Sequence, residues 1–488
     1  MRITERQLFI DGEFRTADAG EPVIEAATES LLGDGASATS GDVDDAVTAA
    51  RHAFPGWAAI PAVERARILD RLADALETRG EHISELATRE TGAPIATSRI
   101  ANSATTVAMF RYYARLIGTM DSEEVRPSLI GHTIVRREPI GVVAAIAAWN
   151  VPQLLAAIKL APALAAGCTA VLKPAPETAL DAVAFGEAAV EAGLPPGVLN
   201  VVAGGRTTGA HLVRHAGVDK VAFTGSTQSG RLVAATCGGL IRPVTLELGG
   251  KSAAIILDDA DLDLTMQGLR TVSFGNNGQV CYACTRILAP RARYGEIVDA
   301  LADLANSLVV GNPLDDAVDI GPLVSSRQRE RVLGYIEAGT AQGARLVAGG
   351  GIPVDRPRGW YVAPTIFADV HNSARIAREE IFGPVLCVIP YESDREAIQI
   401  ANDSELGLGG SVWSSDEARA TEVARAVQTG SIGINCYQLD LDAPFGGIKA
   451  SGIGREYGPE GLANYQTIKS IFGSAELSDR VSSVSRSA

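Results

Sequence analysis

A single cysteine in a stretch of small, uncharged residues is the group in this chain best suited to nucleophilic chemistry. Cys281 follows a Gly-Gln-Val tripeptide, and residues 273–279 carry no charge. Upstream, Glu247 lies in the segment Leu-Glu-Leu-Gly-Gly-Lys, an apolar strand running into a glycine turn. A thiol needs a base or a lowered pKa to attack at neutral pH, and an apolar site raises the pKa of a carboxyl group toward the range useful for a base. The pair predicts covalent catalysis through a thioester.

Each of these residues also has a plain structural explanation. Most cysteines are buried, inert thiols, and Glu247 would serve equally as a paired structural carboxylate. Asn150, in Trp-Asn-Val-Pro, is either an oxyanion donor at a strand end or a turn residue shortly before a proline. No single residue decides between the two alternatives, so the prediction depends on the set.

The composition limits the possible functions. The chain has 488 residues, 46% of them hydrophobic and 21% charged, with a net charge of −15. Nucleic acid and anionic membranes are poor partners for such a charge. The first residues lack a secretory signal, and the charge-free run 139–158 is interrupted by Trp-Asn-Val-Pro-Gln, which favours strand, turn and helix over a membrane span. We therefore expect a cytoplasmic protein with no membrane partner.

Cysteine and histidine spacing argues against a metal site. Six cysteines spread over a long chain indicate free thiols in a reducing compartment. Cys281 and Cys284 have the spacing of half a zinc site or of a redox pair, but no second close cysteine pair exists and the histidines form no ligand-spaced cluster. We expect no bound metal.

The order of apolar runs predicts an α/β fold. Residues 41–118 have helical periodicity, with candidate helices at 42–54 and 64–91. Apolar strands then alternate with helices that begin near residues 152 and 178, which is typical of a doubly wound parallel sheet. A second set of the same kind begins near Gly249 and includes a helix at 325–341. The expected strands are 141–148, 170–172, 198–202, 220–223, 252–257, 286–288, 386–389 and 411–413.

Two strand ends have features of a nucleotide site. The loop from Thr224 to Gly230 follows a predicted strand and opens a helix, so its backbone N–H groups, with Ser226, suit a pyrophosphate. It departs from the G-x-G-x-x-G pattern, having one glycine fewer. Lys173 ends another strand, where ligands of open α/β sheets bind, although a solvated lysine is the alternative.

Taken together, the motifs resemble the aldehyde dehydrogenase superfamily, in family order over nearly the whole chain, and in particular its hydrolytic, NAD(P)-dependent members. The matching segments are Trp149–Pro152, Lys173–Pro174, Phe223–Ser226, Leu246–Lys251, Gly278–Cys281, Glu379–Val385 and Pro444–Glu456.

The resemblance implies two doubly wound Rossmann-like domains plus a small β oligomerisation arm. Residues 1–118 and 139–248 would form the cofactor-binding domain, 119–138 the arm, 249–449 the catalytic domain, and 450–488 a return segment with an oligomerisation strand. The arm would pair with the segment near 465–478 of a neighbour, giving a homodimer or a homotetramer.

The resemblance also implies catalytic roles. Cys281 would attack the aldehyde, and Asn150 with the Cys281 backbone N–H would hold the oxyanion. Glu247 would then activate water to hydrolyse the acyl-thioester. Lys159 and Glu456 match positions associated with proton movement near that base.

NAD is the expected cofactor. Lys173 would bind the adenosine ribose, Glu380 the nicotinamide ribose, and Phe382 would form an apolar wall. Pro176 stands where the family often has a glutamate that disfavours a 2′-phosphate, with Glu177 shifted by one, so NADP remains possible. The full expected set is Trp149, Asn150, Lys173, Gly209, Gly225, Ser226, Gly230, Leu248, Glu380 and Phe382.

The expected substrate channel is mostly apolar and favours a medium-length aliphatic or aromatic aldehyde. Asp440 and Asp442 near its mouth favour an aminoaldehyde instead. The channel positions are Val151, Leu154, Leu155, Ile158, Val280, Tyr282, Leu439 and Phe445.

Three other functions remain open. Glu247 argues against a coenzyme A-acylating enzyme, and the Thr224–Gly230 loop with Glu380 argues against a cofactor-independent cysteine acyl-hydrolase. An intact set of catalytic residues argues against a non-catalytic protein of this fold. Cys284 stands where the family commonly has glycine, which leads to the hypothesis of a reversible, inactivating Cys281–Cys284 disulfide.

Overall fold

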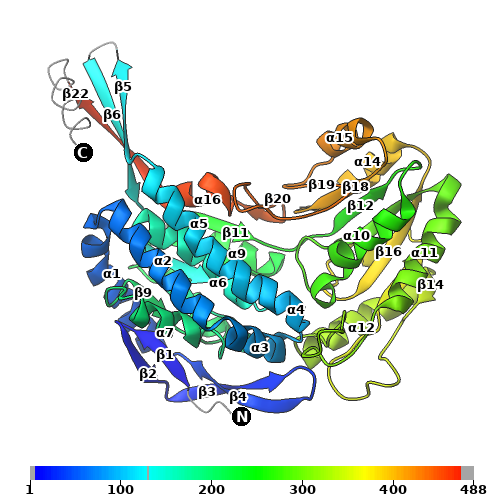
Figure 1. The fold of residues 1–488 in the computed structure, drawn as a ribbon, viewed down its shortest axis with the longest axis horizontal. Helices are drawn as coiled ribbons and strands as arrows, with labels where there is room; N and C mark the ends of the chain where they lie inside the picture. Colours follow the sequence, from blue (N-terminus) through cyan, green and yellow to red (C-terminus); the bar gives the residue numbers. More distant parts are fainter. Residues whose placement is uncertain (1–5, 129–130, 474–488) are drawn as a thin grey trace.

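The computed structural model describes residues 6–128 and 131–473, which form two α/β bodies and a projecting three-stranded arm (Figure 1). The serine-rich tail 478–488 lies outside the described residues. Two large sheets form the centres of the two bodies.

The first sheet is doubly wound. Its parallel core runs in the order β9-β8-β7-β10-β11, so the strand order reverses between β7 and β10. Two antiparallel strands extend one edge, and the short β21 pairs with β11 at the other. The strands are β1 (Gln7–Ile10), β2 (Glu13–Thr16), β7 (Val142–Ile146), β8 (Thr169–Lys173), β9 (Leu199–Val201), β10 (Lys220–Thr224), β11 (Val244–Glu247) and β21 (Gly452–Ile453).

The second sheet repeats this winding. Its parallel strands run in the order β15-β16-β13-β12-β18-β19, with reversal between β12 and β18, and β14 pairs antiparallel at one edge. The predicted pair of Rossmann-like domains is therefore confirmed. The strands are β12 (Ser252–Ile256), β13 (Cys284–Pro290), β14 (Arg345–Ala348), β15 (Thr365–Ala368), β16 (Val385–Tyr391), β18 (Gly410–Trp413) and β19 (Gly433–Ile434).

Helices cover both faces of each sheet with separate apolar clusters. α6 is buried along its whole length because it consists of alanine, leucine and other apolar residues with one glutamine and one lysine, and Pro152 begins it. The helices of the first body are α1 (Ser40–Ala59), α2 (Ala62–Thr78), α3 (Gly80–Thr91), α4 (Ile95–Ser98), α5 (Thr106–Thr119), α6 (Pro152–Ala166), α7 (Val183–Glu191), α8 (Arg206–Arg214), α9 (Thr227–Gly239) and α16 (Gly458–Ala463). Those of the second are α10 (Leu262–Phe274), α11 (Tyr294–Ser307), α12 (Ser326–Ala341), α13 (Arg375–Arg378), α14 (Asp394–Asn402) and α15 (Glu417–Ala426).

Two predicted helices differ from the structure. The single helix expected at 64–91 is interrupted at Arg79, which ends α2 and precedes α3. The helix expected near 178 begins only at Val183, after a 3-10 turn at Pro176–Thr178. Both breaks lie inside continuous apolar patterns, so periodicity alone did not show them.

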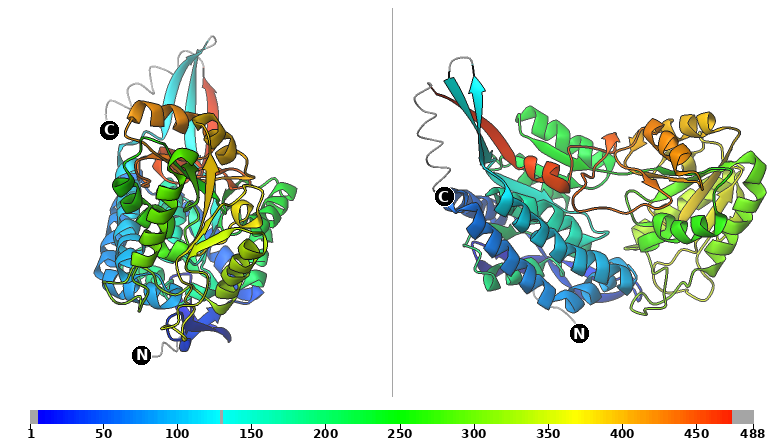
Figure 2. Two further views of the ribbon diagram at one scale, coloured as in Figure 1. Left: turned by 90° about the vertical axis from the view of Figure 1, so that its right-hand side faces the viewer. Right: turned by 45° about the horizontal axis from the view of Figure 1, so that its top comes forward.

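The arm lies where the sequence predicted it, and the C-terminal strand of the same chain joins it. It consists of β5 (Glu123–Ser128), β6 (Gly131–Pro139) and the C-terminal β22 (Gln466–Gly473), which lie side by side in Figures 1 and 2. β22 pairs with β6 of the same chain, from Gln466 opposite Pro139 to Gly473 opposite His132. β22 is an edge strand of this sheet, and its other edge has no strand partner among the described residues, so pairing with a neighbour's arm stays a prediction.

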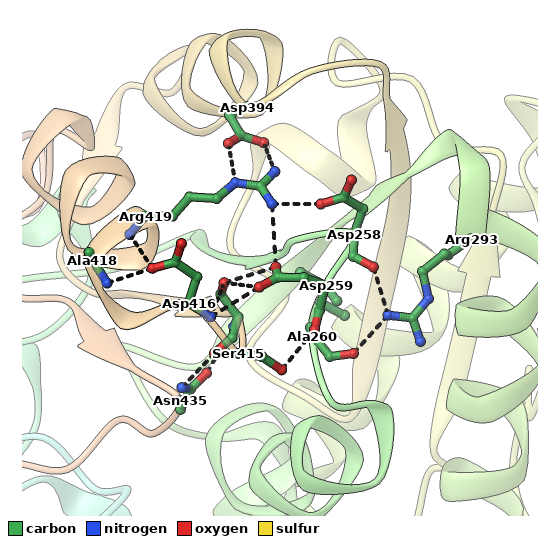
Figure 3. A network of polar contacts seen from close by, with 12 residues as sticks. Asp258, Asp259, Ala260, Arg293, Asp394, Ser415, Asp416, Ala418, Arg419 and Asn435 are labelled. Atoms are coloured by element: carbon green, nitrogen blue, oxygen red, sulfur yellow. Dashed lines mark hydrogen bonds and ion pairs between the residues drawn. The ribbon is translucent and has the colours of Figure 1, made fainter.

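A charged network holds the outer layer of the second body together (Figure 3). Arg419 of α15 donates to both carboxylate oxygens of Asp394, at 2.7 and 2.8 Å, and to Asp258 at 2.7 Å. Asp416 caps the start of α15, and the Ser414 hydroxyl donates its one proton to the Asp259 carboxylate, with Oγ 2.8 Å from each oxygen. α14, α15 and the loop after β12 are thus joined.

Shorter strands complete the structure. β3 (Ala19–Glu25) and β4 (Ser30–Ser37) form a hairpin near the N-terminus, and β17 (Leu406–Gly407) pairs with β20 (Ile448–Lys449).

Candidate active site

One cavity of about 460 Å³ gathers nine of the predicted site residues, including Cys281 and Asn150. Trp149 and Asn150 follow β7, and Gly225 and Ser226 follow β10, so both pairs lie where the strand order of the first sheet reverses. Ligands of open α/β sheets bind at such a point. The lining also includes Ala148, Leu155, Thr224, Leu248, Gly249, Cys281, Arg327, Gln328, Arg331, Glu380 and Phe382.

The loop that carries Cys281 is held by side-chain amides. Asn276 and Asn277 have left-handed backbone angles, φ 51° and 61°, which asparagine tolerates better than most residues. Asn277 Nδ2 donates to the carbonyl oxygens of Gly92 and Pro322, both at 2.8 Å. Gln279 Oε1 accepts from the Val324 N–H at 3.1 Å. Sequence reasoning missed this role of the asparagines, although two of them before a glycine are a turn signal.

The Cys281 thiol is half-buried and protonated at rest. Burial raises its pKa, and the charges of Glu247 and Glu380 raise it further. Gly250 packs against the Cys281 backbone so closely that a Cβ at Gly250 would lie 2.2 Å from the Cys281 carbonyl oxygen. The thiol therefore needs a base before it attacks.

Asn150 donates one hydrogen bond to the cysteine loop and accepts another from it. Its Nδ2 donates to the Gln279 carbonyl at 3.0 Å, and its own carbonyl accepts from Asn276 Nδ2 at 2.9 Å. An amide nitrogen has two hydrogens, so one N–H remains for an oxyanion in the cavity.

Glu247 is buried next to the cavity but does not line it. Neither of its oxygens has a hydrogen-bond partner among the described residues. Burial raises the pKa of Glu247 well above its ordinary value, and the charge of Glu456 adds to this, while Lys159 opposes it. A carboxyl group with a raised pKa suits a general base.

Lys159 and Glu456 form a buried ion pair. Lys159 Nζ donates to Glu456 Oε1 at 2.7 Å and to Thr224 Oγ1 at 2.6 Å, and both charged side chains are almost completely buried. The pair influences the pKa of Glu247, so the structure brings the two residues to the base as the resemblance implied.

Some of the predicted cofactor residues line the cavity, and others lie outside its lining. Glu380 lines the cavity and accepts from the Gly250 N–H at 3.0 Å, and burial raises the pKa of its carboxyl to about 7. The Trp149 and Phe382 rings meet edge to face, 5.2 Å apart. Three predicted residues lie outside the cavity lining: Lys173, Gly209 and Gly230.

Those three residues have packing roles in the structure. Lys173 Nζ donates to the carbonyls of Pro174 and Gly204, and burial lowers its pKa to about 8. A Cβ at Gly209 would lie 3.2 Å from the Lys173 side chain, so glycine makes room for it. Gly230 similarly makes room for Leu248, whose Cδ2 would lie 2.5 Å from a Cβ.

The predicted substrate residues form an apolar wall beside Cys281. Val280 is the exception, because it lies outside the cluster. Two aromatic residues were missed: Tyr437, 4.9 Å from the Tyr282 ring, and Tyr457, 6.0 Å from Phe445. The other predicted members packed with Cys281 are Val151, Leu154, Leu155, Ile158, Tyr282, Leu439 and Phe445.

The two close cysteines belong to different cores. All six cysteines are free. Cys284 lies in the second-sheet cluster with its thiol 3.6 Å from Ser411 Oγ, whereas Cys281 packs against the first-body cluster. This arrangement gives the predicted disulfide no support.

The described residues contain neither a metal-ligating cluster nor a membrane-spanning helix. Residues 6–128 and 131–473 contain no cluster of three or more histidine, cysteine, aspartate or glutamate residues placed to hold a metal. Over the same ranges, none of the helices has the length and apolar composition needed to cross a membrane.

Known proteins match nearly the whole chain. A family model described as "Aldehyde dehydrogenase family" matches residues 14–471. The chain is 51% identical to geranial dehydrogenase of Castellaniella defragrans, covering 97% of this chain and 99% of that protein. It is 40% identical to the chloroplastic betaine aldehyde dehydrogenase of Beta vulgaris, covering 96% and 97%.

Solved structures agree with these matches. An aldehyde dehydrogenase of Mycobacterium tuberculosis complexed with NAD+ is 45% identical, with a TM-score of 0.93 over 96% of this chain and 98% of that one. A mutant of aldehyde dehydrogenase C from Pseudomonas syringae, complexed with NAD+ and octanal, is 39% identical, with a TM-score of 0.93 over 96% of each chain. The chain belongs to the aldehyde dehydrogenase family.

Proposed function

We propose that the protein oxidises an aldehyde to a carboxylic acid, with Cys281 as the nucleophile. The observation that supports this is the meeting of Cys281, Asn150 and Glu380 in one cavity at the switch point of the first sheet. The Cys281 thiol first gives its proton to water in the cavity, and the resulting thiolate attacks the aldehyde carbon. The Asn150 amide with the Cys281 N–H stabilises the oxyanion. Loss of hydride from this thiohemiacetal leaves an acyl-thioester on Cys281.

Glu247 then serves as the base for hydrolysis. Its buried carboxyl removes a proton from water, which attacks the thioester and releases the acid and the free thiol. The buried pair of Lys159 and Glu456 provides a route for the proton away from Glu247. A coenzyme A-acylating enzyme would not need this base.

The cavity fits a dinucleotide. The tight Gly225 turn and the Ser226 N-cap offer backbone donors at the start of α9, and Trp149, Leu248 and Phe382 offer apolar walls. NAD, when bound there, supplies the hydride acceptor. We assign the nicotinamide ribose to Glu380, which lines the cavity. Lys173 lies outside the lining, so a bond from its Nζ to the adenosine ribose would have to replace a bond to the Pro174 or Gly204 carbonyl. The Mycobacterium tuberculosis relative was solved with NAD+, which supports the choice.

We propose a preference for NAD with measurable use of NADP. Pro176 removes the carboxylate that would repel a 2′-phosphate, and Glu177 is partly neutralised by Arg327 at 3.0 Å. The ratio of kcat/KM for the two cofactors tests this, and a higher value with NADP contradicts it.

For the substrate, the apolar wall favours a medium-length aliphatic or aromatic aldehyde. The similarity to geranial dehydrogenase supports this choice. The second candidate is an aminoaldehyde, because Asp440 and Asp442 are exposed near the site, Asp442 raises the pKa of Tyr112, and betaine aldehyde dehydrogenases are also similar. A kcat/KM panel of hexanal, octanal, geranial, benzaldehyde, succinic semialdehyde and betaine aldehyde decides between them. A preference for the cationic aldehyde contradicts the first choice.

Two controls separate this function from its rivals. Product formation without coenzyme A excludes the acylating reaction. Formation of NADH with aldehyde excludes a cofactor-independent cysteine acyl-hydrolase.

Assembly, domain boundaries and location follow as further parts of the proposal. A homodimer or homotetramer is supported by apolar side chains on the arm, among them Ile468 and Phe472, which are 70% and 75% exposed. The division into 1–118 with 139–248, 119–138, 249–449 and 450–488 is supported by the separate sheets. Six free cysteines support a cytoplasmic location.

A further inference from the structure

A buried pair of carboxyl groups lies outside the cavity, between the end of α3 and the start of α7. Glu90 and Asp181 are 1% and 2% exposed. The Leu180 N–H donates to Glu90 Oε1 at 2.9 Å, and Gln153 Nε2 donates to Asp181 Oδ2 at 3.0 Å. The other two oxygens, Glu90 Oε2 and Asp181 Oδ1, have no hydrogen-bond partner among the described residues. Two negative charges buried in this way would be strongly unfavourable.

One proton resolves this arrangement. If Glu90 Oε2 carries it and donates to Asp181 Oδ1, both unpartnered oxygens are satisfied and only one charge remains. Burial, then the charge of Asp181, raises the pKa of Glu90 well above its ordinary value, and burial raises that of Asp181 to about 7. The charged neighbours do not neutralise a second negative charge on Glu90 and Asp181. Arg89, next on α3, is paired with two other carboxylates, and Glu177 is paired with Arg327.

On one side of the pair, Asp181 is hydrogen-bonded to α6, the helix that follows the oxyanion donor Asn150. Gln153 lies in the first turn of α6, three residues after Asn150. Its side-chain nitrogen donates to Asp181 twice, to the carboxylate and to the backbone carbonyl at 2.8 Å. Its backbone N–H donates to Asn102 Oδ1 at 3.3 Å. Asp181 therefore fixes the start of α6.

On the other side, the pair adjoins the support of the cysteine loop. Two residues after Glu90, the Gly92 carbonyl accepts from Asn277 Nδ2 at 2.8 Å. Asn277 lies in the loop that leads to Cys281. A change in the spacing of Glu90 and Asp181 would thus move the ends of two segments that must meet in the site.

We propose that Glu90 and Asp181 share one proton, and that this hydrogen-bonded pair positions the Asn150 end of α6 against the loop of Cys281. Loss of the proton to solvent leaves two facing carboxylates, which repel and separate the segments. The proposal makes both residues positioning residues and rests on the proposed roles of Asn150 and Cys281.

The first test measures stability, which does not depend on activity. A shared proton stabilises the fold fully at low pH and is lost as the pH rises through the raised pKa. The unfolding equilibrium constant of the unaltered protein should therefore rise by up to about tenfold per pH unit from the pKa of an unfolded glutamate, about 4.3, up to the raised folded-state pKa, and should level off above that pKa. Glu90→Gln keeps the hydrogen bond without a titrating proton, so its unfolding equilibrium constant should lack this part of the pH dependence. Glu85→Gln, an exposed change on the same helix, should keep it.

Equal pH dependence in the unaltered protein and in Glu90→Gln overturns the proposal. So does stabilisation of the unaltered protein by sodium or potassium ions at alkaline pH, because an ionised pair would then hold a cation. Gln153 Oε1 and Thr178 Oγ1, which are also buried without a hydrogen-bond partner among the described residues, are further candidate ligands for it. Asp181→Asn is the second variant and should behave like Glu90→Gln. Unfolding of both variants at neutral pH also overturns it, since both substitutions preserve a donor and an acceptor.

The second test separates positioning from general stability. We compare the single-turnover rate of NADH formation in the unaltered protein with the rate in Glu90→Gln. The ratio of the first rate to the second should fall as the pH rises, with the Kd for NAD unchanged within about twofold. A constant ratio overturns the positioning role. Failure of the proposed function would look different, because no aldehyde would give NADH with any variant while the unfolding result would stand.

Discussion

The side-chain amide of Asn150 donates to the backbone carbonyl of Gln279 at 3.0 Å, two residues before Cys281. The Asn276 amide returns a bond to the Asn150 carbonyl at 2.9 Å. The oxyanion donor and the nucleophile loop are therefore fixed to each other across two domains. This pre-orientation means that little reorganisation is needed when the oxyanion forms.

Removal of the Asn150 amide should slow the first chemical step. Asn150→Ala loses an oxyanion donor and the bond to Gln279, so we expect the rate of NADH formation in a single turnover to fall about 10²–10³-fold. Asn150→Asp should lose as much, because a carboxylate repels the oxyanion. The thermal midpoint checks that the fold is kept. A loss below about tenfold in both variants would remove Asn150 from the mechanism.

Hydrolysis of the thioester should depend on pH through Glu247. Burial holds the Glu247 pKa well above its ordinary value, so the active, ionised form increases as the pH rises through that pKa. The deacylation rate should therefore rise with pH, by up to about tenfold per unit below the pKa. Glu247→Gln should lack this limb of the profile, whereas persistence of the limb would assign the base elsewhere.

The Arg419 network should contribute measurably to stability. Arg419→Gln removes bonds to Asp394 and Asp258, and we expect the free energy of unfolding to fall by about 1–3 kcal/mol. Arg425 is an exposed arginine on the same helix with no ion pair in the described part of the chain, so Arg425→Gln is the matched control. Its effect should stay within about 0.5 kcal/mol. Equal effects in denaturant titrations would show that the network adds nothing.

Oxidants should inactivate the enzyme without help from Cys284. The Cys284 thiol lies at Ser411 in another core, so Cys284→Ala should lose activity in peroxide at the same rate as the unaltered protein. Mass spectrometry of the oxidised protein should find no Cys281–Cys284 linkage. Protection by Cys284→Ala would restore the disulfide hypothesis.

The reactive residues were predictable from the sequence because their signals are local. Cys281, Glu247 and Asn150 each lie at a strand end or glycine turn whose residue types restrict the chemistry. The supporting contacts are not local: Asn277 bonds Gly92 and Lys159 bonds Glu456, which are far apart in the chain. The link from Lys159 to the base came only from the family resemblance.

The sequence did not predict that the C-terminal strand pairs with the arm of its own chain. The β22 segment has the composition of an edge strand, and nothing in its sequence distinguishes its own β6 from that of a neighbour. Lys173 satisfies two carbonyls inside its own body, whereas its position at a strand end indicated either a ligand contact or a solvated lysine.

The central claim is that Cys281 carries the acyl group and Glu247 releases it. The most direct test mixes Glu247→Gln with excess aldehyde and NAD and follows NADH from the first turnover. We predict a burst of about one NADH per site, a steady state about 10²–10⁴-fold slower than normal, and an acyl adduct on Cys281 by mass spectrometry. Continued turnover at the normal rate, or a burst without an adduct on Cys281, would contradict the account.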